Sequence, residues 1–336
     1  MATENAPVTA TLPTGYTARP ARGDDETEAE AVLGLIRACD LAETGETDDW
    51  TVQDILDDWR SLGDVTSGTL LIGAPEGQLA GYGDIHSHGA GQLDADVYIH
   101  PSHRGRGLGT FMAHELEARA RRLLGEHPAG MRVVLGTVIT RGNEEARRLL
   151  EAEGYQEARQ FWRMALDMQA PPPEPRWPEG ITARTCVPGQ DERIIFDTLE
   201  EAFIDHWGHA RRSFEEWEEQ SVRSESYDPS LWWLALADDE PAGAIRCRVR
   251  PDGGWVHTLG VRRAWRGRGL GKALLLQAFG AFFQRGIYRV ALGVDAENPT
   301  GATMLYEGAG MRVAAHYTVY QKELRSGAHA AAAPAR

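Results

Sequence analysis

The chain has 336 residues, which is long for one compact core and favours two domains of ordinary size. Apolar residues make up 42% and charged residues 25%, as in globular proteins, and no stretch has the length and apolarity of a membrane span. The formal net charge of −15 argues against nucleic-acid binding, which needs a basic surface, and favours either solubility alone or a cationic ligand such as an amine.

The first half of the chain is predicted to run helices, strands, glycine-rich turn, helix, strand, helix and final strand. Its opening segment, MATENAPVTATLPTG, lacks the features of a signal peptide and is expected to be a disordered arm. A helix-like acidic segment begins at Trp50 and a strand-like segment at Thr69; the hexapeptide RGRGLG follows at Arg104 to Gly109. A strand, Asn143 and an apolar-periodic helix come next. Residues 169–180 are proline-rich and are expected to form a stiff linker.

The second half is predicted to repeat this order. A second RGRGLG spans Arg266 to Gly271. The expected elements are strands at 232–237, 242–249 and 255–261, a helix at 272–284, a strand at 288–294, a helix at 300–307 and a last strand at 314–322. The tail, residues 325–336, has low complexity and is expected to be disordered.

The repeated order indicates a tandem duplication of a whole domain. The spacing between the two hexapeptides also separates Gly81 from Gly243, and the strand-like segment at Thr69 from the one at Leu231. We therefore expect an N-terminal domain at 15–168 and a C-terminal domain at 181–324, each a mixed α/β sheet with helices on both faces.

Glycines at alternate positions of the hexapeptide let backbone N–H groups approach a ligand closely. The helix that follows adds N–H groups without intrahelical partners, so the turn suits a pyrophosphate. In the second copy Arg266, Arg268 and Lys272 add positive charge. The spacing excludes a Walker A loop, and GxGxG differs from the GxGxxG of a Rossmann fingerprint.

Each half resembles an acetyltransferase of the GCN5-related (GNAT) superfamily. The acyl-CoA motif of that superfamily, Arg/Gln-x-x-Gly-x-Gly/Ala, matches Arg104, Gly107 and Gly109, and again Arg266, Gly269 and Gly271. The tandem arrangement and the length are similar to the mycothiol synthases of actinobacteria. The resemblance implies two tandem GNAT domains, each a mixed, mostly antiparallel sheet with a splayed central strand pair, and acetyl-CoA as the co-substrate.

The resemblance also implies a complete cofactor site in the second half. The backbone of Leu259 and Val261 would pair with the pantetheine arm, and Asn298 would contact it. The pyrophosphate would be held by Arg266, Gly267, Arg268, Gly269, Gly271 and Lys272. Tyr306 would protonate the leaving thiolate, a role that suits a phenol.

The two halves differ at positions that matter for catalysis. Leu150 stands in the first half where the second has Tyr306, and Thr110 stands where the second has Lys272. The first half keeps the hexapeptide and Asn143. The C-terminal half is therefore expected to be catalytic, and the N-terminal half degenerate or non-catalytic.

An amine that attacks a thioester must lose a proton to a base or a water relay. Mycothiol synthases carry a Glu at the place of Trp255, so the base and the acceptor stay open. Strand alternation predicts His257 on the same face as Trp255, as a base or as a satisfied strand residue. With Trp255, the segment Asp205, His206 and Trp207 is expected to bind substrate, the alternative being a helix end fixed by tryptophan packing.

The leading interpretation is an acetyl-CoA-dependent N-acetyltransferase acting on the primary amine of a small molecule, cytoplasmic, and a monomer or homodimer. The alternatives are a non-catalytic acyl-CoA-binding regulator and a protein or peptide N-acetyltransferase. No metal, nucleic acid or membrane is expected. His86 and His88 show no evident carboxylate or Cys partner, and the three separated cysteines form no CxxC and indicate a reducing compartment.

Overall fold

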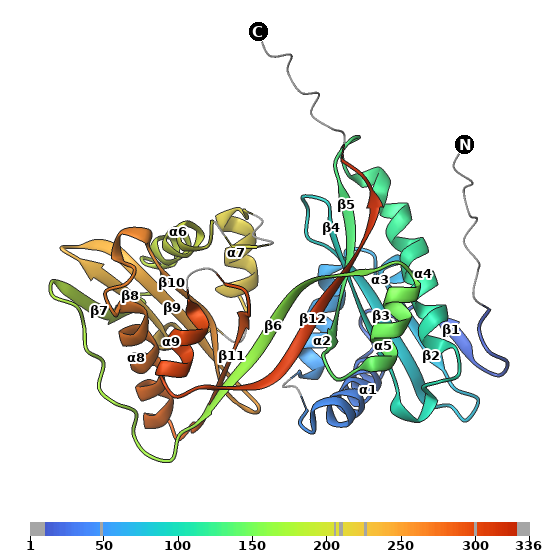
Figure 1. Ribbon diagram of the computed structural model, residues 1–336, viewed down its shortest axis with the longest axis horizontal. Coiled ribbons are helices and arrows are strands. Elements are labelled where there is room, and N and C mark those ends of the chain that lie inside the picture. The colour runs from blue at the N-terminus through green and yellow to red at the C-terminus, as the bar shows by residue number, and fades with distance from the viewer. Residues whose placement is uncertain are drawn as a thin grey trace, which may run out of the picture. The chain divides into compact units, whose positions relative to one another are not determined.

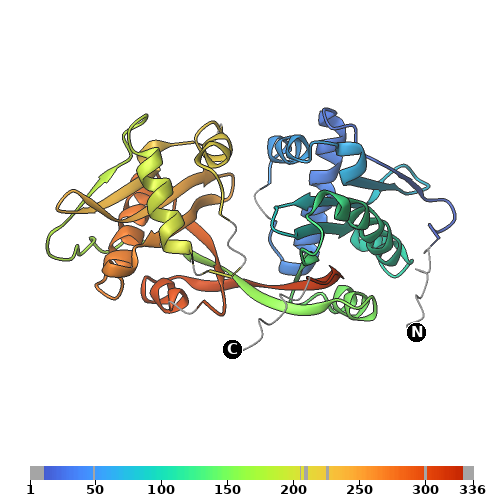
Figure 2. The same ribbon diagram turned by 90° about the horizontal axis from the view of Figure 1, so that it is seen from above.

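The computed structural model describes residues 11–47, 50–204, 206–207, 211–224, 227–298 and 301–327. The chain forms two compact units: unit 1 comprises Met1–Arg159 and Tyr317–Arg336, and unit 2 comprises Gln160–His316. Each unit is a mixed sheet flanked by helices (Figures 1 and 2). No helix in the described part of the chain has the length and apolarity needed to cross a membrane.

Unit 1 contains the elements of the first half and most of the last strand. In chain order they are β1 (Thr17–Arg19), α1 (Glu26–Thr44), α2 (Val52–Ser61), α3 (Val65–Gly68), β2 (Thr69–Gly73), β3 (Leu79–Ser87), β4 (Gln92–Ile99), α4 (Leu108–Leu123), β5 (Val133–Thr140), α5 (Glu144–Ala152) and β12 (Arg312–Arg325). The strand order is β1-β2-β3-β4-β5-β12. Neighbouring strands are antiparallel except β4 and β5.

Unit 2 has the corresponding architecture. Its elements are β6 (Gln156–Asp167), β7 (Ile181–Thr185), α6 (Glu192–Phe203), α7 (Phe214–Ser221), β8 (Trp232–Ala237), β9 (Glu240–Arg250), β10 (Gly253–Val261), α8 (Leu270–Gln284), β11 (Arg289–Asp295) and α9 (Ala302–Gly308). The strand order is β6-β11-β10-β9-β8-β7, and only β10 and β11 are parallel among these described pairs. The predicted mixed and mostly antiparallel fold is confirmed.

The central parallel strands of unit 2 separate after a short paired stretch. Gly254 pairs with Val290 and Trp255 with Ala291, and beyond these pairs β10 and β11 diverge. In unit 1, β4 and β5 pair over three positions that end at Asp94. The splayed strand pair expected from the family resemblance is therefore present in both sheets, and it opens a gap beside the glycine-rich turn.

Helices cover both faces of the unit 2 sheet. A Cβ on Gly260 of β10 would lie 2.8 Å from a side chain of α6. The next residue, Val261, points to the opposite face. There, a Cβ on its cross-strand partner Gly243 would lie 3.4 and 3.5 Å from side chains of α8. Gly260 thus lets α6 pack closely on one face of β10, while α8 lies in ordinary van der Waals contact with the opposite face.

The last strand of each half of the sequence lies in the sheet of the other unit. β12 pairs with β5 from Tyr317 onward, and β6 pairs with β11 over Phe161–Asp167. The compact units therefore differ from the expected domains: the chain passes between them at 159–160 and 316–317, and residues 169–180 belong to unit 2. Alternating side chains specify which face of a strand is buried, and two related sheets offer the same edge, so sequence alone does not assign this strand.

Both chain ends are predicted to be disordered, and the structure describes part of each. Arg325, the first residue of the expected disordered tail, is the last residue of β12. Its guanidinium donates to the carbonyls of Met131, Leu124 and Pro128 at 2.9 to 3.0 Å. Residues 328–336 of the tail and 1–10 of the expected N-terminal arm lie outside the described residues.

The exchanged strands give a stability prediction. Tyr320 of β12 is 3% exposed in a core of unit 1, and Met164 of β6 is 0% exposed in the core of unit 2. Tyr320→Ala should therefore destabilise unit 1 by about 3–5 kcal/mol, and Met164→Ala should destabilise unit 2 by about 2–5 kcal/mol. Hydrogen exchange with mass spectrometry should show faster exchange in β5 for the first variant and in β11 for the second. The reverse pattern would contradict the exchange of strands.

Candidate active site

A cavity of about 630 Å³ lies in unit 2 where β10 and β11 separate. Its wall brings together most of the residues predicted for the site: His206, Trp207, His257, Leu259, Val261, Arg266, Gly267, Gly269, Gly271, Lys272, Asn298 and Tyr306. Trp255 and Arg268 are not among the described residues that line it, and Asp205 lies outside the described residues.

The glycine-rich turn forms a cradle at one end of this cavity. Gly267 and Gly269 have φ of +73° and +88°, and a Cβ on either would meet nothing within 4 Å. Residues of alternating handedness point successive N–H groups to one side, which makes an anion-binding concavity. Gly269 is also the N-terminal cap of α8, whose free N–H groups add to the cradle. The glycines are needed for the backbone conformation and leave the concavity open to a ligand.

The three basic side chains around the turn have different environments. Arg266 donates from Nε to the carbonyl of Val261 at 3.1 Å and from Nη2 to that of Ala202 at 2.8 Å, so it ties the turn to the ends of β10 and α6. Arg268 stacks over the ring of Trp265 at 4.7 Å. Lys272 is exposed and lines the cavity. The geometry gives Arg266 a positioning function and leaves Lys272 as the mobile charge beside the cradle.

Tyr306 projects from α9 into the same cavity. Its side chain is 8% exposed, and burial raises the pKa of its phenol to about 12. No described residue hydrogen-bonds to its hydroxyl, which leaves this donor available to a ligand. Asn298 also lines the cavity but precedes α9 by four positions, since the helix begins at Ala302.

His257 occupies a β-bulge that changes the expected register. Val256 pairs with Cys247 and Thr258 with Arg246, so His257 is the extra residue of β10. Strand alternation from Trp255 therefore does not carry through this point. His257 lines the cavity, whereas the ring of Trp255 lies outside its described lining, 4.1 Å from the guanidinium of Arg250.

The surroundings of His257 disfavour the predicted base role. Nη2 of Arg246 lies 3.3 Å from Nδ1 of His257, and a guanidinium can only donate, so Nδ1 accepts and Nε2 carries the proton. Desolvation and the charges of nearby arginines, Arg246 first, lower the pKa of His257 well below its ordinary value, and because the residue is exposed to the cavity the arginine charges are the firmer cause. The ring is therefore neutral, with its one lone pair already engaged.

The expected acceptor segment contributes two described residues to the wall. The ring of His206 lies 4.3 Å from that of Phe203, and the ring of Trp207 lies 6.2 Å from that of Phe161. Trp207 is 41% exposed and lines the cavity.

Sequence reasoning missed Glu200 and Arg212, which also line the cavity, and Arg246, which lies behind its wall. Glu200 is on α6, five positions before Asp205 of the predicted acceptor segment. Arg246 belongs to RCRVR, where arginines alternate along a predicted strand. In a strand, alternate residues point to the same face, so this pattern in the sequence predicts several cations on one face.

Unit 1 has a corresponding cavity of about 520 Å³, but three polar side chains of its wall are hydrogen-bonded to a carboxylate. Glu43 of α1 accepts hydrogen bonds from Arg104 at 2.6 Å, Thr140 at 2.6 Å and Asn143 at 2.7 Å. Gly107 and Gly109 line this cavity, and so does Leu150 at the place of the phenol. The side chains that the resemblance assigns to a cofactor are thus bonded to an internal anion.

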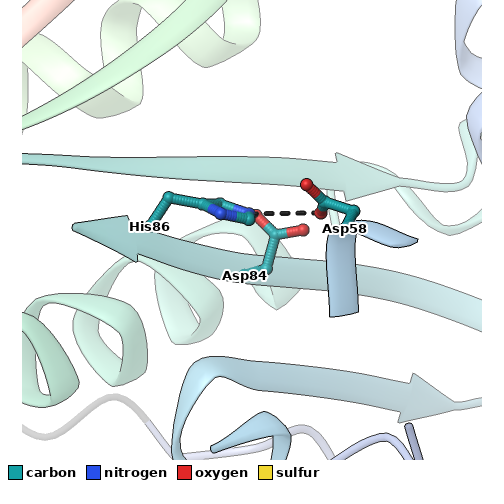
Figure 3. Close-up of side chains that lie close together, drawn as sticks. All are labelled: Asp58, Asp84 and His86. Carbon is teal, nitrogen blue, oxygen red and sulfur yellow. Dashed lines mark ion pairs between the residues drawn. The ribbon is translucent and has the colours of Figure 1, made fainter. Parts of the chain in front are cut away.

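A histidine–carboxylate cluster in unit 1 corrects the sequence interpretation of His86. On β3, Nε2 of His86 lies 3.2 Å from Asp58 and 3.6 Å from Asp84 (Figure 3). His88 likewise lies 3.3 Å from Asp94, so both histidines have carboxylate partners. Although burial disfavours its charged form, hydrogen bonds and charges from Asp58 and Asp84 raise the pKa of His86 to about 10. A carboxylate oxygen from each of Asp58 and Asp84 and a ring nitrogen of His86 lie within 4.8 Å of one another, so the three side chains form one cluster.

Comparisons with known proteins agree with this geometry. The model of the Acetyltransferase (GNAT) family matches residues 31–155 and 193–311, one segment in each half. A mycothiol acetyltransferase of Salinispora arenicola is 30% identical over 273 residues, covering 75% of this chain and 81% of that protein. One from Thermobispora bispora is 30% identical over 309 residues, covering 84% and 92%.

Solved structures give the same result. The crystal structure of a GCN5-related N-acetyltransferase from Sphaerobacter thermophilus is 39% identical with a TM-score of 0.83, covering 95% of this chain and 98% of that one. A tandem GNAT protein from the clavulanic acid biosynthesis pathway, at 17% identity and a TM-score of 0.67, covers 93% and 100% and shares the fold. The chain belongs to the acetyltransferase (GNAT) family as a tandem member, and it is an N-acetyltransferase that uses acyl-CoA as its co-substrate.

Proposed function

We propose that unit 2 transfers the acetyl group of acetyl-CoA to the primary amine of a small molecule. The observation that carries the proposal is one cavity whose wall combines the anion cradle at Gly267 and Gly269, the diverging strands β10 and β11, and the hydroxyl of Tyr306, which no described residue hydrogen-bonds. The relatives named mycothiol acetyltransferases support a small acceptor.

The residues present fit the co-substrate. The open cradle and Lys272 suit a pyrophosphate, and the free edge of β10 at Leu259 and Val261 suits the amide groups of a pantetheine arm. Arg266 would hold the cradle against β10, and Asn298 would lie along the same wall.

Acetyl-CoA supplies an activated thioester, whose C–S bond breaks while a C–N bond forms and a proton of the amine ends on the thiol. Tyr306 donates a hydrogen bond at the leaving sulfur. Because its pKa of about 12 is well above that of an ordinary thiol, the phenol is a weaker acid than the product thiol. Tyr306 therefore stabilises the leaving sulfur, and the net proton comes from the acceptor amine.

We assign removal of that proton to Glu200. It is a carboxylate in the cavity wall on α6, the helix that leads into the acceptor segment. A carboxylate can accept a proton directly or through a water. The other carboxylate in the described wall, Asp295, lies at the end of β11 on the side of Asn298.

Two conservative substitutions test whether Glu200 or His257 is the general base. Glu200→Gln should lower kcat at neutral pH by about 10²–10⁴-fold, the range of general acid–base groups, with partial recovery as pH rises and the free amine increases. His257→Asn retains an acceptor for Arg246 and should lower kcat by less than about tenfold, below the range for a general base. Steady-state kinetics from pH 6 to 10 would decide, and the opposite ranking would return the base role to His257.

Unit 1 is proposed to be non-catalytic. Glu43 accepts hydrogen bonds from Arg104 and Asn143, and its charge would repel a pyrophosphate. Leu150 offers no proton donor in this cavity. Unit 1 would then have a structural role, because β12 pairs with its strand β5 and β6 pairs with β11 of unit 2.

We also propose a reducing cytoplasmic location. Cys39, Cys186 and Cys247 are buried and free. Burial raises the pKa of Cys39 and of Cys186 to about 11, which keeps these thiols protonated and unreactive. Cell fractionation with an antibody to the protein would test the location.

The proposed reaction is tested by thiol release from acetyl-CoA with a panel of small primary amines, with mass-spectrometric identification of the acetylated product. Turnover with at least one amine and none with a lysine-containing peptide supports the proposal. Tight acetyl-CoA binding without thiol release from any amine would favour a non-catalytic acyl-CoA-binding regulator. Acetylation of peptides alone would favour a protein acetyltransferase.

A further inference from the structure

Three arginines lie on one face of β9 beside the unit 2 cavity. Arg246, Arg248 and Arg250 alternate along the strand, so their side chains leave the sheet on the same side. Arg246 is 4% exposed, and its guanidinium lies 4.9 Å from the ring of Trp217 and 4.8 Å from that of Trp232. It is a charge held inside the protein by two aromatic faces.

The charges of Arg246 and Arg248 have no carboxylate partner among the described residues. Arg246 donates to the hydroxyl of Ser221 at 2.9 Å and to Nδ1 of His257 at 3.3 Å, and both of these acceptors are neutral. The Nε atoms of Arg246 and Arg248 are buried without a hydrogen-bond partner. Burial, with the like charges of Arg212 and Arg248, lowers the pKa of Arg246 to about 9. Buried cations are usually paired, so this arrangement lacks an anion.

Arg212 lines the cavity, and Arg246 lies directly behind its wall. Arg212, Trp217 and His257 all line it, and Arg246 touches the last two. Arg212 precedes Ser213, the N-terminal cap of α7, and its exposed guanidinium donates to Oε1 of Gln220 at 3.3 Å. The chain carries a net charge of −15, yet this wall is locally positive. A cationic acceptor without further charge, which the net charge favours, does not fit such a wall.

We propose that the acceptor carries an anionic group, a carboxylate or a phosphate, bound by Arg212, Arg246 and Arg248 beside the amine that is acetylated. The inference rests on the proposed function for the amine. A planar guanidinium fork binds either anion through paired hydrogen bonds. The bound anion would supply the charge that the buried arginines lack.

Matched acceptor pairs test the inference during turnover. Glycine is compared with glycinamide, and O-phosphoethanolamine with ethanolamine, each by kcat/KM for thiol release. At least one anionic member should exceed its neutral partner by about 10- to 100-fold, the range for hydrogen bonds to a charged group. The pair that shows the larger ratio distinguishes carboxylate from phosphate. Neutral members equal to or better than their anionic partners in both pairs would overturn the inference while leaving the proposed function intact.

Three variants locate the effect. Arg212→Gln and Arg248→Gln should each bring the ratio towards one. Arg223→Gln is the matched control, because Arg223 is an exposed arginine of the same unit that pairs with Glu218 and Glu219. It should leave the ratio unchanged. Ratios unaffected by both Arg212→Gln and Arg248→Gln would contradict the assigned site.

A binding measurement keeps the inference testable if no amine is turned over. With the cradle saturated by CoA, calorimetric titration with inorganic phosphate and with acetate reports on anions elsewhere in unit 2. At least one anion should bind the wild type and bind Arg248→Gln about tenfold or more weakly. Absence of binding by both anions, or equal binding to both proteins, would overturn the inference. Absence of thiol release with such binding would instead overturn the proposed function.

Discussion

Gly269→Glu is expected to abolish acetyl-CoA binding, whereas Gly107→Glu leaves it intact. The two glycines are matched: each caps the helix after an RGRGLG, their φ values are +88° and +85°, and no atom lies closer than 4.0 Å to the position of an added Cβ. The backbone cost of a side chain at positive φ, roughly 1–2 kcal/mol, should therefore be similar for both. Only at position 269 does the new carboxylate enter the cradle assigned to the pyrophosphate.

Affinity for acetyl-CoA should fall by at least about 100-fold in Gly269→Glu, because a like charge and bulk replace an open anion site. Calorimetry gives the affinity, and thiol release gives the turnover. Equal melting temperatures of the two variants would show that the structural cost is matched. If both variants lost turnover equally while folded, the assignment of catalysis to unit 2 would be wrong.

Much of the fold is readable from the sequence because the repeat exposes the order of the elements. The strand at 232–237 coincides with β8, and the helix at 272–284 falls inside α8. The glycine-rich turn is predictable in detail, since glycines at alternate positions before a helix have few other uses. The exchange of β6 and β12 is not readable, because the same alternating pattern fits the edge of either sheet.

The chemistry around the turn depends on contacts that spacing does not encode. The bulge at His257 adds one residue to β10, and the partner that engages Nδ1, Arg246, comes from the neighbouring strand. In unit 1, Glu43 reaches Arg104 and Asn143 from a helix far away in the sequence. Motif matching therefore finds two cradles, and only the tertiary structure shows that in unit 1 a carboxylate is bonded to the side chains of Arg104 and Asn143.

Tyr306→Phe is expected to lower kcat by about 10²-fold, the lower end of the range for acid–base groups, because a water can donate in place of the hydroxyl. Affinity for acetyl-CoA should stay the same, since the ring is kept and the hydroxyl makes no hydrogen bond to a described residue. The melting temperature should change little for the same reason. Calorimetry, thermal unfolding and steady-state kinetics measure the three quantities.

The pH dependence gives the decisive comparison. Burial raises the pKa of Tyr306 to about 12, so the phenol keeps its proton, and its donor function, throughout the range from pH 6 to 10. Wild type and Tyr306→Phe should therefore give kcat profiles of the same shape, with the variant lower at every pH. An alkaline limb below pH 10 that disappears in the variant would contradict the buried phenol. An unchanged kcat, with chemistry shown to limit the rate by the absence of a viscosity effect, would rule out any role of Tyr306 at the leaving sulfur.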